Sequence, residues 1–470
     1  MSGNVRLGAA YCLLRQRAGA ASWGWCIALV LAACAPQGGD VTAYVGATVF
    51  DGTGAVVPNA VILESGGHVT AIGSRDSIEV PRGATEVSLD GRWIIPGLID
   101  GHAHAGESTV SRYLSYGITS IRHVGGNLDR LKALGTAIAA DSIPGPRLYL
   151  AGETITGPPA VWPGQTEVRT PSEAAPAVER LAAAGVSQIK LYTHTTPELI
   201  EAVVMAARAH GVPVTAHLGY ADALTAAKLG VNAIEHLSGI VEATVRNPAP
   251  YFAAHERFPN GWMTFLRGWA TLDSAALEKT AAALVTLGTV MVPTLVQSET
   301  YARVLDTTYA ATLDLSAVTS EEREEWNLPD LVRRYAITPA DVPLLATSRS
   351  REDLFVRRYV ALGGSVVAGS DSPNQLLSPG ASLLEELGLL VRAGLTPSQA
   401  LIAATRDAAR LVHADSIGVL KRGAVADFVI LSASPLDDIR NVRQIELVIS
   451  QGRRHQPVEL RKWPSSPAKQ

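Results

Sequence analysis

Cysteine is nearly absent from this chain. Only three of its 470 residues are cysteines, and all of them, Cys12, Cys26 and Cys34, lie within the first 34 residues. The remainder therefore has neither a disulfide framework nor a cysteine metal site. Any metal ion bound there must be held by histidine, by a carboxylate or by a modified lysine.

Basic residues in excess and long membrane-spanning runs are also missing. The formal net charge is −4 and the pI is near 6.3, so the chain lacks the positive field that binds nucleic acid. Beyond the N-terminal region, no apolar stretch is long enough to span a bilayer. The 47% hydrophobic and 18% charged content predicts a well-buried globular protein, with either two domains or one large domain and an attachment.

The N-terminus has the layout of an export signal. Three arginines precede an apolar run from about residue 20 to residue 33, and small residues lead into Cys34. This layout resembles a bacterial lipobox, in which Cys34 becomes the lipidated first residue of the mature chain. A short membrane anchor or an uncleaved leader is the alternative. We expect residues 1–34 to direct the protein to the periplasm or to the membrane surface.

Two kinds of pattern divide the rest of the chain. Residues 41–92 and 415–456 contain short β segments separated by turn pairs, which predicts that both chain ends build one small β-sandwich. Between them, in residues 93–414, strand and helix patterns alternate. This order predicts an α/β fold with a (β/α)8 TIM-type barrel. An open doubly wound sheet is the competitor, but no glycine fingerprint follows the first strand. The predicted strands are 93–99, 118–124, 147–151, 187–192, 213–216, 233–235, 289–294 and 365–368.

One long segment interrupts the alternation after the seventh strand. Residues 297–349 are predicted to be helical and charged. Two interpretations stay open for this insertion, a lid over the barrel mouth or a solvated surface addition.

The predicted strand ends carry residues that can bind metal. His102 and His104 are one residue apart at the end of the first strand, so both imidazoles point the same way. Such a pair alone is weak evidence, because two polar residues can simply end a strand. Four later strand ends add further candidates, and all these ends meet at one face of a barrel. They are Lys190, His217, His236 and Asp371. Together they predict a metal centre.

Two more residues are candidates for substrate binding. Tyr192 shares the inward face of its strand with Lys190, so its hydroxyl either binds a substrate carbonyl or carboxylate, or its ring simply packs in the barrel. Arg122 ends the second strand, and its fork of donors would pair with a substrate carboxylate or with a neighbouring acidic residue. We expect His194, just past the fourth strand, to lie in a solvated loop.

These motifs resemble the amidohydrolase superfamily, specifically its binuclear-metal members, over about residues 41–453. The nearest branch is that of imidazolonepropionase and of exported dipeptidases of the Xaa-Pro (prolidase) type. One position departs from this branch, because His123 follows Arg122 where related sequences usually read Arg-Asp. The matching phrases are Ile95-Pro96-Gly97-Leu98-Ile99-Asp100-Gly101-His102-Ala103-His104, Gln188-Ile189-Lys190, Ala216-His217, Ile234-Glu235-His236 and Ala368-Gly369-Ser370-Asp371.

The resemblance implies two divalent metal ions, expected to be zinc, and a carboxylated lysine. Lys190, modified by CO2, would bridge the ions, with His217 and His236 on one ion. His102, His104 and Asp371 would hold the other. Two such ions acidify a shared water and polarise the scissile carbonyl. Asp371 would pass the proton of that water to the leaving amine.

We therefore expect metal-dependent hydrolysis of amide bonds outside the cytoplasm, acting on dipeptides such as Xaa-Pro or on N-acyl amino acids. Deamination is disfavoured, because deaminases of this superfamily place a carboxylate close after the corresponding histidine, whereas Leu218-Gly219-Tyr220 follow His217 here. Two alternatives stay open. The same centre would also hydrolyse cyclic amides, lactones or esters, and a non-catalytic surface lipoprotein would retain only the scaffold. The expected partner is a small-molecule substrate, with membrane contact only through a lipidated Cys34. Assembly into a homo-oligomer is left open.

Overall fold

The computed structural model describes residues 41–462. The predicted export signal and Cys34 lie outside these residues, so their prediction stays untested. Within the described range, no helix is long and apolar enough to cross a membrane.

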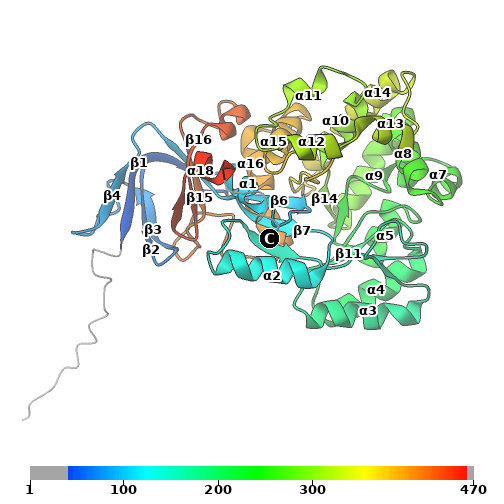
Figure 1. The fold of residues 1–470 in the computed structure, drawn as a ribbon, viewed down its shortest axis with the longest axis horizontal. Coiled ribbons are helices and arrows are strands. Elements are labelled where there is room, and N and C mark those ends of the chain that lie inside the picture. The colour runs from blue at the N-terminus through cyan, green and yellow to red at the C-terminus, as the bar shows by residue number, and fades with distance from the viewer. Residues whose placement is uncertain (1–40, 463–470) are drawn as a thin grey trace, which may run out of the picture. The chain divides into compact units, whose positions relative to one another are not determined.

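The two ends of the described chain form one sheet of eight strands. Its hydrogen-bonded order is β17-β16-β15-β5-β1-β2-β3, and β4 pairs with β1. The blue N-terminal strands and the brown C-terminal strands lie side by side (Figure 1). The sheet therefore joins both chain ends, as predicted for the sandwich. Its strands are β1 (Thr42–Phe50), β2 (Val56–Ser65), β3 (His68–Ser74), β4 (Thr85–Ser88), β5 (Trp93–Pro96), β15 (Phe428–Leu431), β16 (Ile445–Ser450) and β17 (Arg453–His455).

The junction between this sheet and the barrel lies at Gly97. The sequence predicted a single strand over 93–99, but β5 belongs to the end sheet and the barrel strand β6 (Leu98–Ala103) begins after Gly97. A side chain at position 97 would not fit, because its Cβ would lie 2.2 Å from Oγ1 of Thr119. Strand 93–99 is therefore corrected to two strands that serve two different sheets.

The barrel strands are all parallel and fall into two sheets, β6-β7-β8 and β10-β9-β11-β12-β13-β14. A hydrogen bond of 2.8 Å from Ser187 N to Leu150 O connects the two sheets. The predicted eighth strand is reduced to a bridge between Met291 and Val366, and Gly101 N bonds to Ala368 O at 2.9 Å. The cyclic order is that of a (β/α)8 barrel. The remaining strands are β7 (Ile118–His123), β8 (Arg147–Leu150), β9 (Ile155–Thr156), β10 (Thr166–Glu167), β11 (Ile189–Leu191), β12 (Val214–Ala216), β13 (Ala233–Glu235) and β14 (Val290–Val292).

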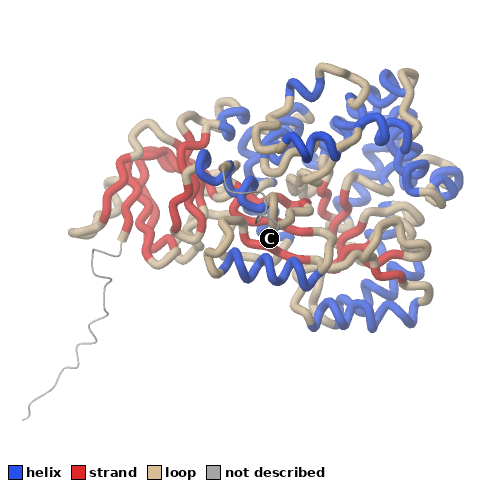
Figure 2. Tube along the Cα trace, viewed as in Figure 1, coloured by secondary structure: helices blue, strands red, loops and turns tan. Residues whose placement is uncertain are grey.

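Amphipathic helices flank these strands (Figure 2). In α4 (Pro197–Ala209), proline occupies the first turn, where its missing N–H is harmless. Apolar residues spaced by three and four then give α4 one buried face. The other helices around the barrel are α1 (Val110–Ser115), α2 (Leu128–Ala139), α3 (Pro171–Ala183), α5 (Ala223–Leu229), α6 (Ile240–Thr244), α7 (Ala249–Ala254), α8 (Phe258–Gly268), α9 (Ser274–Thr286), α15 (Ala381–Arg392), α16 (Pro397–Ala403) and α17 (Arg406–Leu411); the short α18 (Pro457–Arg461) follows the end sheet.

The segment predicted as an insertion is helical and is tied to the barrel. Arg112 of α1 pairs with Glu322 of the insertion across 2.7 Å. The buried Arg349, on the last helix of the insertion, pairs with Glu299 of the first helix at 3.2 Å, which fastens the two helices together. It also pairs with Glu352 of its own helix at 2.5 Å. The helices are α10 (Leu295–Arg303), α11 (Tyr309–Thr312), α12 (Ser320–Glu325), α13 (Leu328–Arg334) and α14 (Asp341–Ala361). Because these links hold the insertion against the barrel, its side chains can contribute to the cavity described next.

Candidate active site

A cavity of about 710 Å³ opens at the carboxyl ends of the barrel strands. The six predicted metal ligands all contribute to its lining. They are His102, His104, Lys190, His217, His236 and Asp371. The predicted substrate residue Tyr192 also lines the cavity, as do several residues of the insertion. Side chains separated by up to 269 positions in the sequence therefore converge on one space.

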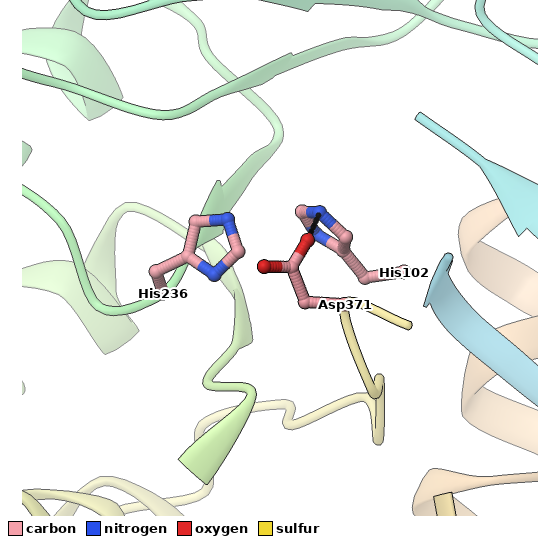
Figure 3. Close-up of side chains that lie close together, drawn as sticks. All are labelled: His102, His236 and Asp371. Atoms are coloured by element: carbon pink, nitrogen blue, oxygen red, sulfur yellow. Dashed lines mark ion pairs between the residues drawn. The ribbon is translucent and has the colours of Figure 1, made fainter. Parts of the chain in front are cut away.

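Three of the predicted ligands form a close group. His102, His236 and Asp371 each offer a ligand atom, and these atoms lie within 4.8 Å of one another. Figure 3 shows the Asp371 carboxylate between the two imidazoles. Its Oδ1 lies 3.0 Å from Nε2 of His102 and 3.3 Å from Nε2 of His104. A carboxylate among imidazoles is a donor set suited to zinc and similar divalent ions.

The other two predicted ligands are buried polar groups without a partner in the part of the chain that the structure describes. Nζ of Lys190 and Nε2 of His217 make no hydrogen bond to any described residue. Burial lowers the pKa of Lys190 to about 8, against the opposing effect of Glu235. Buried polar atoms are normally satisfied, since leaving one unpaired is unfavourable. A carboxylated lysine and a metal ion beside His217 would satisfy both atoms, so these residues fit the expected centre.

Glu235 fixes the orientation of His102. Its carboxylate accepts a hydrogen bond of 2.6 Å from Nδ1 of His102 and pairs with Arg122 at 2.9 Å. The Thr215 hydroxyl donates to the same carboxylate. Burial would raise the pKa of Glu235, but Arg122, Lys190 and His102 hold it well below its usual range. An anion behind a ligand imidazole sets its tautomer and strengthens its basicity.

Sequence reasoning assigned no role to Glu235. The available signal was its position, because an acidic residue at the end of a short apolar strand is buried and must have a partner.

The position of Arg122 corrects its predicted substrate-binding role. Arg122 is 1% exposed and is not among the described residues that line the cavity. It donates to Gln188, to the carbonyl of Gly101 at 2.9 Å and to Glu235. Of the two interpretations of this residue, pairing with a neighbouring acidic group is the one that the contacts support. Nε and Nη1 of the guanidinium are thus engaged inside the barrel wall, away from the residues that line the cavity.

Polar contacts also hold the remaining ligands. Nδ1 of His236 lies 2.7 Å from the Thr294 hydroxyl. Gln297, in the first turn of α10, donates its side-chain amide to Oδ2 of Asp371. Burial lowers the pKa of His236 well below its usual value, which favours the neutral imidazole that a metal ion requires. Gln297 was not predicted, because nothing local in the insertion indicates that it meets Asp371.

Tyr192 is held at the cavity wall by a tryptophan. Nε1 of Trp162 donates to the Tyr192 hydroxyl at 2.9 Å. An indole can only donate, so the phenol accepts in this bond and keeps its own hydrogen for another acceptor. Burial raises the pKa of Tyr192, which keeps the phenol protonated. Tyr192 can therefore donate a hydrogen bond into the cavity.

His194 lies inside the protein and not in a solvated loop. His194, expected in a solvated loop, is buried, with its ring nitrogens 2.7 Å from Pro159 O and 2.8 Å from His255 O. That prediction was wrong, because segments distant in the sequence cover the loop.

His123 is also buried, and burial lowers its pKa to about 3. It contacts Ala105 O at 3.0 Å and is not among the described cavity residues, so the departure from Arg-Asp lies outside the cavity lining.

A parallel barrel with histidines, a buried lysine and an aspartate at its strand ends defines a class, the metal-binding barrel hydrolases. The chain belongs to the amidohydrolase family, whose sequence profile matches residues 93–454. It is thus a hydrolase of carbon–nitrogen bonds on a TIM-type barrel with a β-sandwich. An uncharacterized protein of Mycobacterium tuberculosis is 24% identical over 413 residues, which cover 82% of this chain and 91% of that protein.

Three solved structures illustrate the likeness of the fold. A bottromycin amidohydrolase superposes with a TM-score of 0.69 at 23% identity, covering 90% of this chain and 88% of that one. A Xaa-Pro dipeptidase with bound methionine gives a TM-score of 0.65 at 22% identity, with 88% and 100% covered. The ochratoxinase of A. niger gives 0.64 at 18% identity, with 89% and 96% covered. At these identities the likeness establishes the fold alone. The substrates of the three proteins are not assigned to this chain.

Proposed function

We propose that this protein hydrolyses the amide bond of dipeptides, including Xaa-Pro dipeptides, or of N-acyl amino acids. The observation that carries the proposal is the convergence of all six predicted ligands on one cavity. Within residues 41–462, Lys190 and His217 each present a buried atom that has no hydrogen-bond partner. The family acts on carbon–nitrogen bonds, and a Xaa-Pro dipeptidase is among the proteins of similar fold.

The residues present suit two zinc ions and a carboxylated Lys190. His102, His104 and Asp371 would hold one ion. His217 and His236, whose ring centroids are 4.8 Å apart, would hold the other, and Lys190 would bridge. When bound, such ions polarise a carbonyl and make a water acidic near neutral pH.

The protein's own side chains would orient the substrate and carry the proton. Asp371, positioned by Gln297 and His102, accepts a proton from the attacking water and delivers it to the leaving amine. Tyr192 donates its phenolic hydrogen to a substrate oxygen, while Trp162 holds the phenol in place. Glu235 binds Nδ1 of His102, which leaves Nε2, on the opposite side of the ring, free to bind the metal ion.

The test is amine release from a panel of dipeptides and N-acyl amino acids. We would use the full chain loaded with zinc in the presence of bicarbonate. Chelator-sensitive release from members of this panel supports the proposal. No release by protein that holds two zinc ions contradicts it, and the search then moves to cyclic amides, lactones and esters at the same centre. If these are inert too, a non-catalytic lipoprotein is the better account.

We also propose that residues 1–34 export the protein and that Cys34 is lipidated. The support is the order of positive, apolar and small residues before Cys34. Mass spectrometry of the N-terminal peptide from bacterial membranes tests this. A lipid-modified Cys34 at the new N-terminus is expected. An unmodified peptide that still begins at Met1, recovered from the cytosolic fraction, would contradict it.

A further inference from the structure

The cavity wall is rich in aromatic rings although the chain is not. Aromatic residues make up 6% of the sequence, yet six aromatic residues of the described range line this one cavity. We call these six the aromatic wall: Trp162, Tyr192, Phe258, Trp262, Tyr301 and Tyr335. None of them is a metal ligand, so the centre itself does not account for their presence.

One half of the aromatic wall runs from the rim to the metal ligands. Trp162, which is 41% exposed, contacts Phe258 edge-on with ring centroids 5.7 Å apart. Phe258 lies 5.8 Å from Tyr192 and 5.8 Å from the ring of the ligand His217. A continuous series of rings therefore joins the solvent edge of the cavity to the place where an amide bond would be cut.

The other half continues from the same ligand to the insertion. Trp262 lies 5.3 Å from His217 and 6.0 Å from Tyr301 of α10. Tyr301 lies 5.2 Å from Tyr335, which follows α13. The insertion thus supplies part of the cavity wall.

This wall is matched to a flat aromatic group. Aromatic pairs gain stability from offset and edge-on contacts at centroid distances of about 4.5–7 Å, beyond the gain from burying apolar area. The rings already contact one another within that range, and a cavity of about 710 Å³ has room for a further ring beside them. An aliphatic group of equal size would gain only the burial of apolar area.

We infer that the substrates of this enzyme carry a flat aromatic group next to the scissile amide, and that the aromatic wall binds it. The inference rests on the proposed amide hydrolysis, because it names the substrate class of the same cavity. It is nevertheless testable by binding alone, with ligands that contain no amide bond.

The experiment compares three acids by calorimetry on the zinc-loaded full chain: 4-phenylbutyrate, 4-cyclohexylbutyrate and butyrate. All three carry the same carboxylate and chain, so differences in Kd report the ring. The phenyl acid is expected to bind at least tenfold more tightly than butyrate and at least threefold more tightly than the cyclohexyl acid. Equal Kd values for the phenyl and cyclohexyl acids would overturn the inference.

Two variants locate the preference. Trp162→Ala removes a partly exposed ring, so folding should survive, and the phenyl-to-butyrate ratio is expected to fall at least threefold. Phe258→Ala should reduce it further. The control is Met205→Ala, a truncation of an exposed apolar side chain on α4, far from the aromatic wall in sequence, which should leave the ratio unchanged. An unchanged ratio in both Trp162→Ala and Phe258→Ala would place the aromatic ligand elsewhere and contradict the inference.

Turnover separates this inference from the proposed function. For the wild type, kcat/KM for N-acetylphenylalanine should exceed that for N-acetylalanine at least tenfold. If both are hydrolysed equally well and the phenyl acid shows no preference in binding, hydrolysis stands and the aromatic inference fails. If neither is hydrolysed but the phenyl acid binds preferentially, the wall is confirmed and amide hydrolysis of these substrates fails.

Discussion

Glu235 lies 2.6 Å from Nδ1 of His102, and both side chains are buried. The opposite nitrogen of the same ring lies 3.0 Å from Asp371. One imidazole thus connects a structural carboxylate to the predicted metal centre, and Arg122 balances the charge of that carboxylate.

We expect Glu235→Gln to weaken zinc binding about 10–100-fold, because a neutral amide supports the ligand imidazole less well. It should also destabilise the fold by about 3–5 kcal/mol, since the buried Arg122 loses its counter-ion. Chelator competition and denaturant unfolding measure the two effects.

The matched control for this substitution is Glu446→Gln. Glu446 pairs with Arg92 at 2.7 Å, but this pair is at the surface. Its loss should change stability by less than about 1 kcal/mol and leave zinc affinity unchanged. Equal effects of the two substitutions would show that Glu235 has no special role.

Trp162→Phe should lower kcat/KM about 2–10-fold. The substitution keeps an aromatic ring but removes the N–H that donates to the Tyr192 hydroxyl at 2.9 Å. A typical hydrogen bond contributes about 0.5–1.5 kcal/mol. The check is a double-mutant cycle, in which Trp162→Phe has no further effect once Tyr192→Phe is present. Additive losses would mean that the two residues act independently.

Lys190→Ala should abolish binding of two zinc ions and remove the effect of bicarbonate on metal uptake. The reason is that carboxylation would occur at the buried Nζ, which has no partner among the described residues. Metal analysis with and without bicarbonate provides the measurement. Lys228→Ala, an exposed lysine at the end of α5, serves as the control. Retention of two ions by Lys190→Ala would contradict the bridging role.

Glu386 predicts a pH dependence of stability. Burial raises its pKa from 4.5 to about 8, although backbone N–H groups of Val296 and Leu295 act against the shift. A carboxyl whose pKa is raised on folding stabilises the fold fully below its unfolded pKa. That contribution is lost as the pH rises through about 8, by about 1.4 kcal/mol for each pKa unit of difference.

Glu386→Gln mimics the protonated form, so its stability relative to the wild type should improve between pH 5 and pH 9. Thermal unfolding at the two pH values tests this. A difference in Tm between variant and wild type that does not change with pH would contradict the raised pKa.

The ligands were predictable because their signals are local. His102 and His104 are spaced by two on one strand, and Lys190 lies within an apolar run where a charged group needs a special reason. The order of strands and helices likewise follows from hydrophobic periodicity. These signals sufficed for the barrel and for all six residues that converge on the cavity.

The rest depends on contacts between distant segments. The split at Gly97 follows from Thr119, which leaves no space for a side chain there. The role of Arg122 depends on its pairing with Glu235, which lies 113 positions away in the sequence. The aromatic wall is assembled from a loop, from α8 and from the insertion, and no spacing in the sequence relates Trp162 to Tyr301.

The most direct test of the central claim compares amine release by the wild type and by Asp371→Asn. Both proteins would be full-length and zinc-loaded, with a dipeptide that the wild type cleaves. Asp371→Asn keeps the shape of the side chain but cannot accept a proton. Asp76→Asn, at an exposed position, is the control and should retain full activity. We predict that kcat falls about 10²–10⁴-fold in Asp371→Asn. Equal turnover by Asp371→Asn and the wild type would contradict proton transfer by Asp371, and with it the mechanism proposed for this cavity.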